Sequence, residues 1–195
     1  MSEKHPTKRR LLDAATAEFA AFGIAGARVD RIAATAGVNK AQMYAYYGSK
    51  SGLFDAVFQE HNEAILDAVP FTADDLPGYA ARLYDAYVND PKLVRLATWN
   101  RLERIQVGNL LADLAVLTAK KYEAIAEAQR VGQLDPAISP ADVYSLVIAL
   151  SLTWGPSSVT YAASHEDSEA DHAYRRAVIE KIVARAFAYP AHDET

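Results

Sequence analysis

The sequence contains no cysteine, which excludes disulfide bonds and thiolate metal sites and is typical of proteins in a reducing compartment. Long apolar runs are also missing: the longest apolar-rich stretch, 143–153, is too short to span a bilayer and includes two serines. The N-terminal residues MSEKHPTKRR precede no apolar segment, so we expect no signal peptide. Strand-like alternation, internal repeats and low-complexity tracts are absent. Together these absences predict a soluble, cytoplasmic protein with no membrane partner.

Charge is distributed unevenly along a chain whose net charge is only −5. The first 50 residues hold eight basic and four acidic side chains, a balance of +4, whereas the other 145 hold twelve basic and twenty-one acidic ones, a balance of −9. A basic head on an acidic body indicates that one end of the chain meets an anion. Chance clustering of charges is the alternative.

Apolar residues recur at three- and four-residue steps through almost the whole chain, which is typical of amphipathic helices. Glycines at 23, 37 and 48 stop the early helices, and prolines at 77, 91 and 140 stand where first helical turns begin. We expect helices over 7–22, 29–36, 39–47, 49–69, 77–89, 91–105, 109–131, 140–153, 156–163 and 169–188. The predicted fold is all-α, with a three-helix domain over residues 1–52 and a larger helical domain over residues 53–195.

The stretch DRIAATAGVNKAQMYAYY predicts a helix-turn-helix, in which two short helices flank a tight glycine turn and the second enters the DNA major groove. Asn39 is placed to cap the second helix, and Gln42 three residues later is placed to complete a capping box. The outward positions at the start of this helix suit contacts with DNA. They are Lys40, Ala41, Gln42 and Tyr44.

This stretch resembles the DNA-binding domain of the TetR family of bacterial regulators, whose pattern runs close to I-A-x-x-A-G-V-S-x-x-x-L-Y-x-Y-F-x-x-K. The chain has IAATAGVNKAQMYAYYGSK, and the resemblance covers roughly residues 8 to 55. It implies that Tyr44 and Tyr46 contact the DNA backbone. It also implies that Lys50, with the amides that begin the fourth helix, holds a phosphate. Lys40 and Gln42 occupy the variable positions that read bases.

Several positions depart from the family pattern or allow a second interpretation. Arg28 stands where a threonine commonly caps the second helix, so the cap is lost and a phosphate contact is gained. Ala45 replaces a common histidine, while Asn39 replaces a serine and caps equally well. Tyr47 matches a packing residue, and Gln42 serves only the capping box in the alternative interpretation. The basic residues 8–10 contact phosphate or are simply solvated.

Two helices of the larger domain are apolar on more than one face, 140–153 and 169–188. In 169–188 one stripe contains Tyr174, Val178 and Ile182, and a second contains Ile179, Val183 and Phe187. A helix that is apolar on two faces must be covered twice, and a second copy of the chain can supply that cover. The resemblance likewise implies a homodimer, which would bind an inverted-repeat operator.

Aromatic and amide side chains between the head and these helices suggest a pocket for a small, largely apolar or aromatic effector. The alternative for each is an ordinary core position, and the pocket as a whole is what the resemblance implies. The candidate residues are Tyr87, Trp99, Asn100, Tyr122 and Trp154.

Other classes of function have weaker support in the sequence. No Gly-rich phosphate loop, GxSxG or HExxH motif occurs, so an enzyme is not expected. A metal site is suggested only weakly by the cluster His165, Glu166, Asp167 and His172, because no third ligand at a suitable spacing is evident. We predict neither a metal nor a cofactor. A helical interaction module does not explain the basic head. The sequence favours a ligand-released repressor, with an activator or a corepressor-dependent regulator as alternatives.

Overall fold

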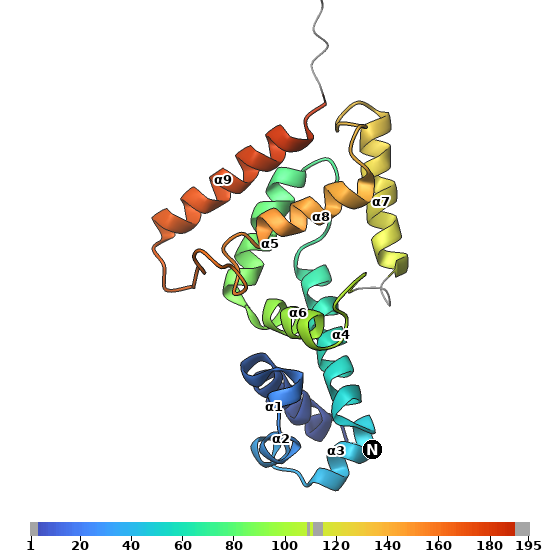
Figure 1. Ribbon diagram of the computed structural model, residues 1–195, viewed down its shortest axis with the longest axis vertical. Helices are drawn as coiled ribbons and strands as arrows, with labels where there is room; N and C mark the ends of the chain where they lie inside the picture. Colours follow the sequence, from blue (N-terminus) through green and yellow to red (C-terminus); the bar gives the residue numbers. More distant parts are fainter. Residues whose placement is uncertain (1–3, 109, 111–114, 190–195) are drawn as a thin grey trace, which may run out of the picture. The chain divides into compact units, whose positions relative to one another are not determined.

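The computed structural model describes residues 4–108, 110 and 115–189, and all regular secondary structure in these ranges is helical (Figure 1). The predicted all-α class is confirmed. An isolated bridge joins Leu134 to Ala188. The helices are α1 (Lys4–Gly26), α2 (Val29–Ala36), α3 (Lys40–Tyr47), α4 (Lys50–Ala68), α5 (Leu76–Asn89), α6 (Lys92–Glu103), α7 (Ala115–Arg130), α8 (Pro140–Ser151) and α9 (Glu169–Phe187).

The chain forms two compact units, which we call the N-terminal unit (residues 1–65 and 90–110) and the C-terminal unit (residues 66–89 and 111–195). The N-terminal unit therefore includes most of α4 and all of α6, whereas the sequence had suggested a boundary at residue 52. The reason is packing, because α6 lies against α1 and the apolar face of α4 belongs to the same core.

One apolar core holds the N-terminal unit together. Phe19 of α1 and Phe54 of α4 meet edge to face, with ring centroids 5.3 Å apart. Ile32 of α2, Met43 of α3 and Leu96 of α6 are fully buried in the same cluster. Each of these five helices thus contributes a side chain to the core that positions the helix-turn-helix.

In the C-terminal unit, α5 packs on α8 and α9, and α7 packs on α8 (Figure 1). The α9 stripe of Ile179, Val183 and Phe187 is buried within the unit. The other predicted stripe is only partly covered, since Tyr174 is 69% and Ile182 44% exposed, while Val178 is half-buried. A single chain therefore buries only one of the two apolar faces of α9.

Among the described residues, some predicted helices have other bounds or no helical counterpart. The predicted helix over 156–163 is wrong: this segment forms turns, Val159 is fully exposed, and no apolar face is available to stabilise a helix. α1 is interrupted at Gly23 but continues to Gly26. The start of the predicted helix 109–131 lies partly outside the described residues, and the described helix begins at Ala115.

Among the described helices, none combines the length and the apolar character that a membrane span requires.

Candidate nucleic-acid interface

The turn between α2 and α3 is built from local signals. Gly37 adopts the left-handed conformation, with φ 66° and ψ 38°, and follows the last residue of α2. The Val38 amide donates to the Ala33 carbonyl at 3.0 Å, and the Gly37 amide donates to the Ala34 carbonyl at 3.1 Å. This glycine-dependent helix ending satisfies carbonyl groups that would otherwise lack partners.

α3 begins with the predicted capping box. The Gln42 amide donates to Asn39 Oδ1 at 2.9 Å, and the Asn39 amide donates to Gln42 Oε1 at 3.2 Å. Both contacts confirm the structural role expected for these side chains. They fix the first turn of α3, so that the residues on its outer face are presented in one orientation.

The two faces of α3 differ sharply in exposure. Met43 is fully buried, and Tyr46 and Tyr47 are partly buried against the core. Tyr47 donates a long, 3.5 Å hydrogen bond to the Lys8 carbonyl, and burial raises its pKa to about 12. Tyr47 therefore packs against the core, as its match to a packing position predicted. The outward face carries exposed side chains, namely Lys40, Ala41, Gln42 and Tyr44, the last being 47% exposed.

Two acidic side chains, Asp30 and Glu18, contact the basic residues of the helix-turn-helix. Lys40 pairs with Asp30 of α2 at the surface. Arg28 provides no side-chain cap to α2, as expected, but its backbone amide donates to Glu18 Oε1 at 2.8 Å. Burial opposes the ionisation of Glu18, yet hydrogen bonds from Arg31 and the Arg28 amide outweigh it and lower the Glu18 pKa. Glu18 thus anchors the beginning of α2 from α1.

Lys50, the first residue of α4, lies beside backbone carbonyl groups. Its amine donates to the carbonyls of Ala25 at 3.2 Å and Ala27 at 3.1 Å. An ammonium group has three donors, so one remains for another acceptor. The lysine therefore fixes the segment that precedes α2 and can still contact a phosphate.

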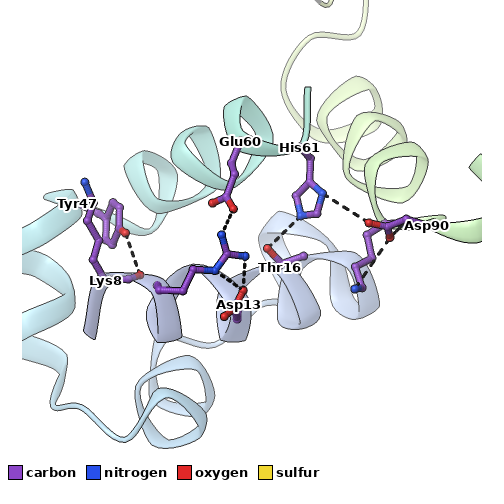
Figure 2. Close-up of polar contacts among 9 residues, drawn as sticks. Lys8, Asp13, Thr16, Tyr47, Glu60, His61 and Asp90 are labelled. Atoms are coloured by element: carbon purple, nitrogen blue, oxygen red, sulfur yellow. Dashed lines mark hydrogen bonds and ion pairs between the residues drawn. The ribbon is translucent and has the colours of Figure 1, made fainter. Parts of the chain in front are cut away.

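Further polar contacts join α1 to α4 (Figure 2). Arg9 pairs with both Asp13 and Glu60, so its charge is already compensated within the chain. His61 lies within 3.3 Å of the Thr16 hydroxyl and 4.0 Å from Asp90. Burial lowers the pKa of His61. These contacts hold the two helices that frame the helix-turn-helix.

Two family models match the chain where these features lie. The model described as bacterial regulatory proteins, tetR family, matches residues 11–57. The model described as the tetracyclin repressor-like C-terminal domain matches residues 75–185. The chain belongs to the TetR family.

Individual relatives agree with this TetR-family membership. The HTH-type transcriptional repressor SCO4008 of Streptomyces coelicolor is 40% identical over 147 residues, which are 74% of this chain and 76% of that protein. The regulator RutR of Escherichia coli K12 is 30% identical over 150 residues, 73% of this chain and 70% of its own length. The crystal structure of the transcriptional regulator SCO4942 from Streptomyces coelicolor matches with a TM-score of 0.77 and 36% identity, covering 94% of this chain and 99% of that one.

As a TetR-family protein, the chain is a DNA-binding transcriptional regulator, and the family does not consist of enzymes. Family membership also implies operator DNA, a dimer and a small-molecule effector as partners. The exposed outer face of α3 is the surface of the helix-turn-helix that can enter the groove.

The side chains predicted to bind the effector lie in both compact units. Trp99 and Asn100 belong to the N-terminal unit, where Trp99 packs against the core and donates to the Ala20 carbonyl at 3.4 Å. The Asn100 side chain is buried, and its Oδ1 accepts no hydrogen bond from the described residues. Tyr87, Tyr122 and Trp154 belong to the C-terminal unit.

Within the C-terminal unit, several aromatic rings and one ammonium converge around Tyr144. The Lys121 amine donates to the Tyr144 hydroxyl at 2.8 Å and lies 4.8 Å from the centroid of its ring. The Tyr122 ring centroid is 6.0 Å from that of Tyr144. Burial, followed by the nearby Tyr144, raises the pKa of Tyr87. The whole group, called here the Tyr144 cluster, contains Phe71, Tyr79, Tyr87, Lys121, Tyr122 and Tyr144.

The acidic segment before α9 is engaged in protein contacts. Asp167 pairs with Arg175 at 2.6 Å and accepts a hydrogen bond from Tyr161 at 3.0 Å. His172 Nδ1 lies 2.8 Å from the Tyr84 hydroxyl. Within the described residues, no three His, Cys, Asp or Glu side chains gather as a metal site.

Sequence reasoning missed residues whose partners are distant in the chain. Glu18 and Asp30 were counted only as charges, although they position Arg28, Arg31 and Lys40. Glu103 was not singled out at all. Its spacing from Trp99 is visible in the sequence, but nothing local shows that both reach α1.

Proposed function

We propose that the chain is a repressor that binds an inverted-repeat operator as a homodimer and is released by a small effector. The observation that carries the proposal is the capped α3 helix, whose exposed outer face follows the left-handed turn at Gly37. The 40% identical Streptomyces coelicolor relative, named as a repressor, supports the direction of regulation. The proposed operator would lie in chromosomal DNA, so the proposed location is the bacterial cytoplasm.

In the proposed complex, different residues of the N-terminal unit carry affinity and sequence preference. Tyr44 and Tyr46 contact the backbone through their hydroxyl groups, and Lys50 and Arg28 neutralise phosphates. Lys40 and Gln42 reach base edges, and the small Ala41 allows close approach to the groove. For Lys40 this requires exchange of the surface ion pair with Asp30, which costs little because both side chains are more than half exposed.

The effector site that we propose is the Tyr144 cluster of the C-terminal unit. Its rings offer apolar and aromatic contact area, while the phenol groups and Lys121 offer a few polar contacts. No ion pair with a carboxylate compensates Lys121 within the described residues. The proposed effector is therefore small, largely apolar or aromatic, with a polar group that meets Lys121.

The other predicted effector residues have more specific roles in this proposal. Trp154 meets Tyr84 edge to face, with centroids 6.1 Å apart, and serves packing. Trp99 serves contact with α1. Asn100 lies in the N-terminal unit and is not part of the proposed effector site; its buried carbonyl oxygen has no donor among the described residues, which costs about 1–3 kcal/mol.

Selection of bound fragments from genomic DNA tests the function. We expect the purified protein to enrich fragments that share an inverted repeat, with half-sites separated by about one helical turn or more. Fluorescence anisotropy with the selected sequence and a shuffled control then gives the specificity ratio at fixed salt. Equal affinity for both sequences would refute sequence-specific regulation.

A further inference from the structure

The break in α1 leaves backbone groups that need partners. At Gly23 the chain turns out of helical geometry, with φ 74° and ψ −179°. In an unbroken helix the Ile24 amide would donate to the Ala20 carbonyl. Here the Ile24 amide donates instead to Glu103 Oε1 at 3.2 Å, and the Ala25 amide donates to Glu103 Oε2 at 2.6 Å. The α1 segment after the break therefore receives its N-terminal cap from α6.

The same face of α6 supplies the donors for the other side of the break. Arg95 Nε donates to the Ala20 carbonyl at 2.7 Å, and Trp99 Nε1 donates to it at 3.4 Å. Arg95, Trp99 and Glu103 follow one another at four-residue steps, so they share one face of the helix. In this way α6 replaces the hydrogen bond that α1 loses at Gly23.

At the break itself, Gly23 of α1 lies very close to side chains of α6. A Cβ atom at Gly23 would lie 2.5 Å from Glu103 Oε1 and 3.0 Å from the Trp99 ring. Only glycine avoids this overlap, and its positive φ favours glycine as well. The backbone of α1 is thus in direct contact with the carboxylate that caps it.

The capped segment leads directly into the helix-turn-helix. Its carbonyl groups at Ala25 and Ala27 accept from Lys50, and the next amide, that of Arg28, donates to Glu18. Arg28 immediately precedes α2. Any movement of this segment therefore moves the beginning of α2, and with it the outer face of α3.

We propose that Glu103 is a positioning residue for DNA binding: by capping Ile24 and Ala25 across the Gly23 break, it fixes the orientation of α2 and α3. The proposal rests on the proposed function, because orientation is read through operator binding. A carboxylate is suited to this place, since charged acceptors form the stronger hydrogen bonds. Glutamine retains one acceptor oxygen and no charge, so it should act in part.

The test compares the full-length protein with Glu103→Ala and Glu103→Gln. Glu63→Ala is the matched control. Glu63 is an exposed carboxylate of α4, and among the described residues its one hydrogen bond is accepted from Gln59. Binding is measured for the selected operator, for operators with half-sites moved by one base pair, and across a salt series. Thermal unfolding sets a temperature at which all variants are folded.

We expect Glu103→Ala to weaken operator binding about tenfold, which corresponds to about 1.4 kcal/mol. The ratio of its affinities for the native operator and for operators with moved half-sites should fall, because α2 and α3 are then less rigidly oriented. The salt slope should stay native, because no phosphate contact is lost. Glu103→Gln should lie between, and Glu63→Ala should match the native protein.

Native spacing preference and affinity in Glu103→Ala would overturn the positioning role while leaving the proposed function intact. Absence of sequence-specific binding by the native protein would instead reject the proposed function. In that case amide hydrogen exchange still tests whether Glu103 caps the segment. Glu103→Ala should accelerate exchange at Ile24, Ala25 and through α2, and unchanged protection there would refute the capping role. If the alanine variant does not fold, Glu103→Gln provides the same comparison.

Discussion

The Lys50 amine has two roles, one within the chain and one proposed for DNA binding. It donates to the carbonyls of Ala25 and Ala27 within the chain, and its remaining donor is proposed to hold a phosphate. The amides at the start of α4 support the second task, since helix N-termini favour anions. Tyr44 differs, because it is 47% exposed and neutral. These two residues should therefore affect binding and stability in different ways.

We predict that Lys50→Ala weakens binding to all DNA sequences and flattens the log–log salt dependence by about one unit. It should also lower the melting temperature, because two carbonyl groups lose their charged donor. Tyr44→Phe should weaken binding as broadly but leave the salt slope and melting temperature native, since a phenol releases no counterion. A native salt slope in Lys50→Ala would contradict its phosphate role.

At the scale of elements, the short helices were predictable because their signals are local. Gly37, Asn39 and Gln42 determine the turn and the start of α3 within six residues, and all three act as expected. The break in α1 was seen only as a stop at Gly23, because the groups that let the helix resume come from Glu103, about eighty residues later. Such long-range capping has no sequence period that could reveal it.

The failed helix over 156–163 illustrates the opposite error. A helix over 156–163 was expected to follow a break at Pro156. The residues of this segment offer no stripe to bury, and Val159 is fully exposed. Short helices depend on tertiary packing, which this segment lacks. Effector residues were similarly uncertain, because an aromatic side chain such as Trp99 suits a core as well as a pocket.

The exposed stripe of α9 provides an element-scale prediction. Val178→Glu combined with Ile182→Glu should convert the dimer to a monomer, because the second copy would have to bury two carboxylates. Light scattering at micromolar concentration measures the mass. Glu180→Lys is the control, since this exposed residue lies on the opposite side of α9 from the stripe and should leave the dimer intact. A native protein that is already monomeric at this concentration would contradict the proposed interface.

For the whole molecule, charge follows the compact units. The N-terminal unit carries twelve basic and nine acidic residues, a balance of +3, and the C-terminal unit carries eight basic and sixteen acidic ones, a balance of −8. A positive unit attracts the DNA backbone, while the negative one does not compete for it. DNA binding and effector binding are therefore proposed for separate units, joined by the continuous chain of α4.

Because the proposed effector lowers DNA affinity, the two ligands must oppose each other equally. A 100-fold loss of operator affinity requires about 2.7 kcal/mol of differential effector binding, which about 100 Å² of extra buried apolar surface could supply. We predict that saturating operator DNA weakens effector binding by the same factor, measured by calorimetry with and without the operator. Tyr122→Ala in the Tyr144 cluster should weaken the effector while sparing operator affinity. Equal effector affinity in the two titrations would show that the molecule tested is not the effector, however tightly it binds.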